Sequence, residues 1–335
     1  MDIEKILENI KNKIYHPIYF LTGEEPYFID KIRKTIEKTV LSDAEKEFNQ
    51  ATVYGRDMDM VQIISLAREY PVFGNYRVVI VREAQDLKDL DKDERFKTYL
   101  KNPVKSTILV FDYKYSKIDG RTELSKLLEK NAVYFQSKKL YDNQIPDWIG
   151  KQIEMQGYRI GAKTRFILAE NLGNDLSKIE NEINKLVINL RKGSEITAED
   201  IEKNIGISKD YNIFELQNAL GRKDIYKANE IIRNFASNPK ENPAIKIISM
   251  LFAYFKKIFL FHFLKDKSDN NVAAQLGTKP FFVKDFRVAA SNYNTFKVRE
   301  IIAILREYDQ KAKGVESGTM DDGEILKEMV FKILH

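Results

Sequence analysis

Two short stretches have the form of nucleotide-binding elements, but their side chains suit neither phosphate nor magnesium. In a P-loop hydrolase the first strand runs into G-x-x-x-x-G-K-[ST], whose amides and lysine hold the phosphates. Here the apolar run 18–21 is followed by Thr22-Gly23-Glu24-Glu25-Pro26. Glu24 and Glu25 put carboxylates where phosphate charge would lie, and Pro26 has no amide hydrogen to donate. We expect this stretch to repel phosphate.

The second stretch lacks the residue that would hold Mg²⁺. The apolar run 78–81 should lead into a metal-binding carboxylate, but Arg82 and then Glu83 follow it. Arginine cannot ligate Mg²⁺, which binds oxygen atoms. Two altered motifs in the correct order favour a nucleotide-hydrolase-like fold that hydrolyses no nucleotide. The alternative is an unrelated α/β protein in which Arg82 is simply an exposed residue at a strand end.

Other catalytic or metal-binding patterns are weak. The chain has no cysteine and three histidines, and the spacing of the histidines matches no zinc site. The pairs Asp57/Asp59 and Asp321/Asp322 could be drawn as metal ligands, but each pair lies in a turn or capping context without a third ligand nearby. No G-x-S-x-G motif or Ser-His-Asp set is evident. We therefore expect no catalytic residue, metal or cofactor in the isolated chain.

Positive charge is concentrated in the C-terminal part. Residues 1–208 hold 34 basic and 34 acidic side chains, whereas the last 127 hold 21 and 16. This part also contains cations near aromatic residues, which would suit a helical nucleic-acid-binding protein. The alternative is an ordinary solvated helix face over buried phenylalanines. The residues concerned are Lys256, Lys257, Lys279, Phe281, Phe282, Lys284 and Arg287.

Short β-rich runs alternate with helical patterns through the first 140 residues. This alternation predicts right-handed crossovers and a parallel five-stranded sheet with helices on both faces. The predicted strands are 18–21, 51–54, 77–81, 107–111 and 132–135, and the clearest helical segments between them are 27–40 and 58–70.

From about residue 137 onward only helical patterns remain. Pro146 is placed to begin a helix, and Trp148 in that helix is expected to be a core residue. A turn at 206–210 indicates a further boundary. We predict an α/β domain at 1–140, a small all-α domain at 141–208 and an all-α domain at 209–335.

No targeting or membrane segment is apparent. The first residues are charged and no apolar run follows them, and the apolar stretch 247–264 is interrupted by Lys256-Lys257. A cytoplasmic location is the expectation.

Taken in order, the motifs resemble the delta subunit of the bacterial DNA polymerase III clamp loader, a family related to AAA+ ATPases that lacks their catalytic motifs. The resemblance extends from about residue 15 to the C-terminus. It is carried by residues 19–27, 71–81, 117–121, 173–176, 182–186 and 211–216.

The resemblance implies a three-domain subunit: an AAA+-like domain, a helical lid and a helical collar. Such a subunit grips the ring-shaped sliding clamp and opens one of its interfaces. It is a non-catalytic part of the polymerase holoenzyme, and it forms a hetero-oligomeric ring with the gamma/tau and delta prime subunits. Those partners hydrolyse ATP, and primed DNA is reached through the assembled complex. An active AAA+ remodelling ATPase would require the phosphate and metal ligands that we do not find.

The resemblance also places the clamp-binding element at Val72-Phe73, next to Pro71, at the end of the helix before the third strand. The first member of this pair is often leucine in the family, so Val72 is a departure, whereas Phe73 fits as the aromatic plug. Without the resemblance, the sequence favours a Phe73 that packs in the core beneath the turn, where most phenylalanines lie.

A charged loop after the fourth strand contains Asp119 and Arg121. Related ATPases sense nucleotide at this place. Here these two residues either contact a neighbouring subunit or cap the next helix, and the sequence does not distinguish the two. Lys279, Lys284 and Arg287 are further possible contacts to a subunit or to DNA.

Overall fold

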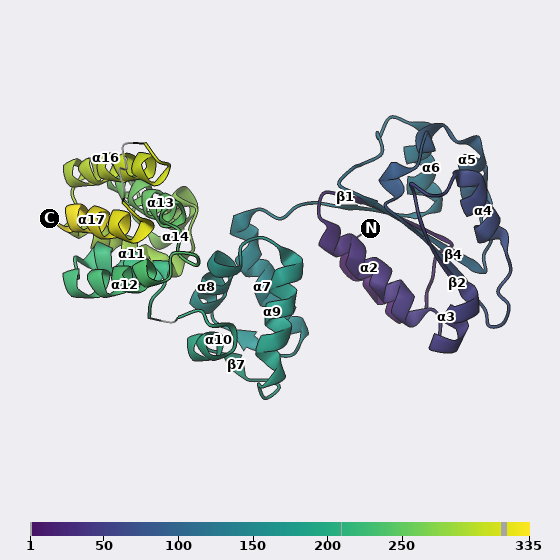
Figure 1. Ribbon diagram of the computed structural model, residues 1–335, viewed down its shortest axis with the longest axis horizontal. Coiled ribbons are helices and arrows are strands. Elements are labelled where there is room, and N and C mark those ends of the chain that lie inside the picture. The colour runs from purple at the N-terminus through teal and green to yellow at the C-terminus, as the bar shows by residue number, and fades with distance from the viewer. Residues whose placement is uncertain (1, 209, 316–319) are drawn as a thin grey trace. The chain divides into compact units, whose positions relative to one another are not determined.

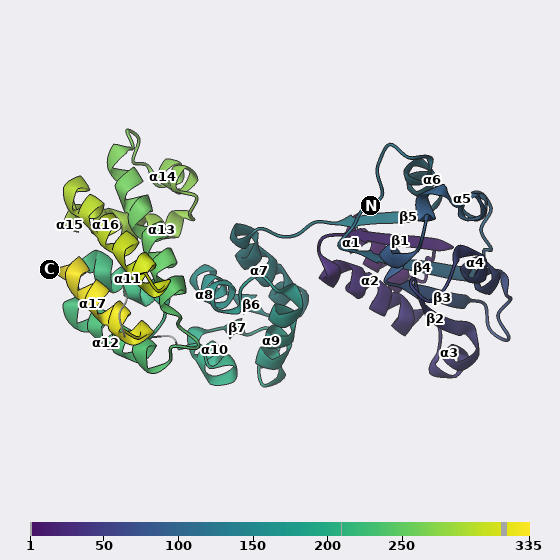
Figure 2. The ribbon, with the colours of Figure 1, turned by 45° about the horizontal axis from the view of Figure 1, so that its top comes forward.

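A computed structural model of the chain describes residues 2–208, 210–315 and 320–335. The chain forms two compact units. The first contains the residues up to Ile145 together with Asn174–Ser177, and the second contains Pro146–Gly173 together with Lys178–His335. Figures 1 and 2 show the elements of each unit.

The first unit contains the predicted five-stranded parallel sheet, with strand order β2-β3-β4-β1-β5. All five predicted strands are confirmed. Their apolar runs are nearly continuous because the central strands are buried on both faces. The strands are β1 (Ile18–Gly23), β2 (Gln50–Tyr54), β3 (Arg77–Arg82), β4 (Thr107–Lys114) and β5 (Val133–Ser137).

Helices cover both faces of this sheet, as predicted (Figure 2). Alternate residues of β1 face opposite ways: Ile18 and Phe20 pack with α4, α5 and α6, whereas Tyr19 and Leu21 pack with α1 and α2. The helices are α1 (Ile3–Lys11), α2 (Pro26–Thr39), α3 (Asp43–Asn49), α4 (Met60–Arg68), α5 (Glu94–Lys101) and α6 (Glu123–Asn131).

The chain after β5 is helical, with one addition to the all-α prediction. Two residues of β6 (Arg159–Ile160) pair in parallel with two of β7 (Glu195–Ile196), and Ile196 is buried. Segments of two residues are too short to show a periodicity, so the sequence pattern could not reveal this pair. The helices here are α7 (Ile145–Met155), α8 (Ala162–Leu172), α9 (Leu176–Ile188) and α10 (Ala198–Ile205).

The C-terminal helices share one hydrophobic core, and Figure 1 shows them gathered in a bundle. They are α11 (Ile213–Arg222), α12 (Ile225–Ser237), α13 (Ala244–Phe263), α14 (Asp269–Leu276), α15 (Val283–Asn292), α16 (Thr295–Ala312) and α17 (Asp322–Leu334). Among the described residues, none of the helices is both long and apolar enough to span a bilayer.

Contacts join the predicted lid and collar segments within the second unit. Phe166 of α8 packs edge-on against Phe282, at a distance of 5.5 Å between ring centroids, and Phe282 stacks on Phe214 of α11. An ion pair between Lys163 and Glu215 adds to this contact. Trp148 of α7 is buried, as predicted.

Candidate functional site

The loop between α4 and β3 carries the predicted Val72-Phe73 pair. Helix α4 ends at Arg68, because Glu69 is already extended and Pro71 follows shortly after. The pair therefore lies in the loop, four residues beyond the end of the helix, and not at the helix end itself. Pro71 is half-buried and precedes the exposed part of the loop.

Both side chains of the pair face solvent. Val72 is 68% exposed and Phe73 is 43% exposed, so the alternative in which Phe73 packs in the core is wrong. The Phe73 ring lies against the ring of Phe48, at the end of α3, with 5.4 Å between centroids. Tyr70 of the same loop is also exposed. The loop thus presents an apolar surface.

A buried asparagine fixes the backbone of this loop. The Asn49 side chain is fully buried; its Oδ1 accepts a hydrogen bond from the Val72 amide at 2.8 Å, and its Nδ2 donates one to the Phe73 carbonyl at 2.5 Å. The polar backbone groups of the pair are therefore bound inside the protein while the side chains point outward. Sequence reasoning missed Asn49, which lies more than twenty positions away.

Arg77, the first residue of β3, fixes the base of the same loop. Its buried guanidinium donates to the Leu66 carbonyl in the last turn of α4, at 3.1 Å, and to the Phe48 carbonyl, at 3.3 Å. It also forms an ion pair with Glu69. One side chain thus connects the ends of α3 and α4 to the central sheet.

Replacing Asn49 with aspartate should loosen the loop, because a carboxylate can accept from the Val72 amide but cannot donate to the Phe73 carbonyl. We expect a loss of roughly 1 to 3 kcal/mol in the free energy of unfolding, the usual cost of a broken buried hydrogen bond. Chymotrypsin should also cleave the variant faster in residues 70–73. Unchanged unfolding in urea and unchanged cleavage would contradict the role of Asn49.

At the position expected for a phosphate loop, two backbone amides donate to protein atoms. Strand β1 ends at Gly23, and Glu25 already caps α2 by accepting from the Tyr27 amide at 3.2 Å. The amides of Glu24 and Glu25 donate to the carbonyl and the hydroxyl of Ser137, at 3.3 and 3.1 Å. Burial raises the pKa of Glu25. The donors that would hold phosphate are therefore already occupied by Ser137 at the end of β5.

Arg82 and Glu83 lie where β3 ends. The Arg82 guanidinium lies over the Tyr54 ring, 5.6 Å from its centroid, and Glu83 adopts a left-handed backbone conformation, with φ of 51°. Within residues 2–208, 210–315 and 320–335, no group of three or more acidic or histidine side chains is close enough to hold a metal ion.

The other candidate contacts are largely paired with the protein itself. Arg121 forms an ion pair with Asp119 at 2.7 Å, and its hydrogen bonds lower the pKa of Asp119. Thr122, not Asp119, caps α6. Lys279 pairs with Asp147, Arg287 pairs with Asp269, and Lys284 is exposed.

Comparison with known proteins identifies the family. Residues 19–138 match the family model described as DNA polymerase III, delta subunit, and residues 210–333 match the model of its C-terminal domain. The chain belongs to the DNA polymerase III delta subunit family. The Bacillus subtilis (strain 168) DNA polymerase III subunit delta is 26% identical over 339 residues, covering 98% of this chain and 96% of that protein. The structure of the Bacillus subtilis DNA clamp loader delta protein aligns with a TM-score of 0.57 and 26% identity, covering 99% of both chains.

This delta-family chain also has a buried ionic network that sequence reasoning missed. Asp112 of β4 is 1% exposed and lies 2.9 Å from the guanidinium Nε of Arg33 on α2. Arg33 pairs further with Asp30 at 3.0 Å and with Glu37 at 2.7 Å. Burial raises the pKa of Asp112 from its ordinary value of 3.8 to about 7, although Arg33 and Lys114 oppose this shift.

The raised pKa of Asp112 predicts a pH-dependent stability. Between about pH 4 and 7 the unfolded chain has lost a proton that the folded chain keeps, so the free energy of unfolding should fall as pH rises, by up to about 1.4 kcal/mol per pH unit. Asp112→Asn should remove this contribution. Urea unfolding of both proteins from pH 4.5 to 7.5 would measure the difference. If the free energy of unfolding of the unmutated protein instead rose with pH relative to that of Asp112→Asn, Arg33 would be keeping the Asp112 carboxylate ionised.

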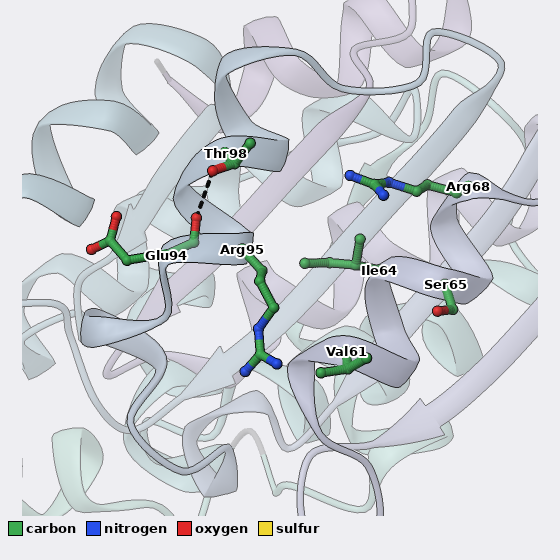
Figure 3. Close-up of a pocket in the computed structure, with 7 residues that line it drawn as sticks. All are labelled: Val61, Ile64, Ser65, Arg68, Glu94, Arg95 and Thr98. Atoms are coloured by element: carbon green, nitrogen blue, oxygen red, sulfur yellow. Dashed lines mark hydrogen bonds between the residues drawn. The ribbon is translucent and has the colours of Figure 1, made fainter.

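A groove of about 300 Å³ lies between α4 and α5. Figure 3 shows Ile64 between the guanidinium groups of Arg68 and Arg95. None of the site residues predicted from the sequence lines this groove. The lining of the groove thus includes neither the Val72-Phe73 pair nor the residues at the position expected for a phosphate loop.

Proposed function

We propose that this chain is the clamp-loader subunit that binds the sliding clamp through the Val72-Phe73 loop and opens its ring without hydrolysing ATP. The observation that carries the proposal is an exposed aromatic side chain on a loop whose backbone is fixed from beneath by Asn49 and Arg77. The choice of the sliding clamp as the partner is supported by membership of the delta subunit family and by the clamp-loader name of the aligned structure.

The fixed loop suits binding on energetic grounds. Burying a phenylalanine in a preformed apolar pocket contributes roughly 2 to 3 kcal/mol, the scale of a binding hot spot. A loop that is already ordered loses little further entropy when it binds. Only the 43% of Phe73 that is still exposed can be buried by a partner, and most of the contribution from that part would remain available for holding the clamp.

Opening the ring requires no chemistry in this subunit. A ligand shifts a closed-to-open equilibrium by its differential affinity for the two states. A loop that fits the open clamp better than the closed one therefore favours opening through binding alone. The occupied amides of Glu24 and Glu25 support the absence of nucleotide from this step.

The three predicted domains would have separate roles in the assembled loader. Residues 1–140 would present the clamp-binding loop, residues 141–208 would form the lid, and residues 209–335 would form the collar that joins the gamma/tau and delta prime subunits. Primed DNA would be reached through the assembled complex in the cytoplasm. We do not propose a separate nucleic-acid-binding function, since Lys279 and Arg287 are paired with acidic side chains and Phe282 is stacked on Phe214.

The test uses the isolated chain and a sliding clamp labelled with fluorophores on both sides of one subunit interface. We expect the chain to bind the clamp and to separate the labels equally well with and without Mg-ATP. The lone chain should show no saturable ATP binding by calorimetry. Failure to bind the clamp would overturn the proposal, and a strict requirement for ATP by the lone chain would overturn its non-hydrolytic part.

A further inference from the structure

We infer that Phe48, at the end of α3, is a second aromatic anchor that contacts the same partner as Phe73. This inference rests on the proposed function, because the partner is the sliding clamp. It extends the binding surface from one loop to two elements that lie far apart in the sequence.

The two rings form one exposed surface. Phe48 is 54% exposed, and its ring is inclined at 59° to that of Phe73 with 5.4 Å between centroids, within the range of favourable aromatic pairs. Val72 beside them is also exposed. A partner that covers Phe73 would therefore lie close enough to touch Phe48.

The backbone at Phe48 is fixed by the same buried side chains that fix the loop. Arg77 donates to the carbonyls of Phe48 and of Leu66 in α4. Asn49, which follows Phe48 in the chain, is hydrogen-bonded to the backbone of both Val72 and Phe73. The backbone segments that carry the two rings are thus held in a set relation before a partner arrives. Rigid aromatic side chains whose burial is completed by a partner are typical binding hot spots.

The composition of α3 gives no structural reason for an exposed phenylalanine there. Its other residues are mostly polar, and the Ser42–Glu45 capping box fixes its first turn. Phe48 is not part of the two hydrophobic clusters that pack on the faces of the five-stranded sheet. We infer that the two inclined rings bind together in a concave apolar site on the sliding clamp.

The experiment measures clamp affinity by surface plasmon resonance for the unmutated chain, Phe48→Ala, Phe73→Leu and the double variant. The Phe73→Leu background keeps part of the apolar side chain, so that binding remains measurable. We expect Phe48→Ala to weaken binding at least fivefold in both backgrounds. Phe296→Ala, which removes an exposed phenylalanine from α16, is the matched control and should not change affinity.

The outcomes separate the inference from the proposed function. If Phe48→Ala weakened clamp affinity in the unmutated background but not in the Phe73→Leu background, Phe48 would only position Phe73. That result would overturn the inference. Binding by Phe48→Ala within twofold of the unmutated chain would also overturn it, while clamp binding that still depends on Phe73 would leave the proposed function intact. Thermal unfolding of each variant would verify that the first unit remains folded.

Discussion

Replacing Phe73 with alanine should reduce the affinity of the isolated chain for the sliding clamp at least tenfold. The expected loss corresponds to about 1.4 kcal/mol, which lies within the contribution of a phenylalanine buried in an apolar pocket. Because Phe73 is 43% exposed and the backbone of its loop is held by Asn49, the substitution should leave the fold intact. A pull-down with purified clamp, followed by surface plasmon resonance, would measure the change.

The control for this experiment is an equally drastic truncation elsewhere. Phe296→Ala removes a more exposed phenylalanine from α16 and should leave clamp capture unchanged. Equal capture by the Phe73→Ala variant and the unmutated chain would remove Phe73 from the mechanism. If neither protein captured the clamp, the proposed function itself would fail.

Replacing Gly23 with alanine should destabilise the first unit by roughly 2 to 5 kcal/mol and lower its unfolding temperature by about 10 °C. Gly23 has a φ of +121°, and an added Cβ would lie 2.1 Å from the Ser137 carbonyl oxygen. The contact is with backbone of the neighbouring strand, so no side-chain rotation can relieve it. Differential scanning calorimetry would measure the shift.

Gly120→Ala provides the matched control. Gly120 has no positive φ, and a Cβ added there would meet nothing within 4 Å, so the same substitution should have little effect. The comparison also tests why a glycine stands at the end of β1. Tolerance of alanine at residue 23 would contradict the view that close packing against β5 requires a glycine there.

The sheet could be predicted from the sequence because its strands are buried on both faces and therefore read as unbroken apolar runs. Helix α3 was missed, although Ser42 and Glu45 form a capping box that could have indicated its start. Its residues are mostly polar, so no apolar periodicity marked it. This omission also concealed Phe48.

The candidate site was only partly predictable. The resemblance predicted Val72 and Phe73 as the clamp-binding pair, but the loop geometry that exposes them depends on Asn49 and Arg77, which approach from other elements. No local pattern encodes such contacts. Asp112 offered a weak signal, because a carboxylate inside the apolar run of β4 requires a partner. The partner, Arg33, comes from a helix some eighty positions earlier.

The contacts of the Arg77 guanidinium determine how a force on the Val72-Phe73 loop would be transmitted to the sheet. A force applied to the Val72-Phe73 loop would be transmitted to Arg77 through its contacts with Glu69 and Leu66. Arg77 is the first residue of β3, which is hydrogen-bonded to β2 on one side and to β4 on the other. A force on the loop would thus be distributed over β2, β3 and β4 and would not detach the loop alone from the surface. The loop is therefore attached to the central sheet by side-chain hydrogen bonds and an ion pair, and not by its own backbone alone.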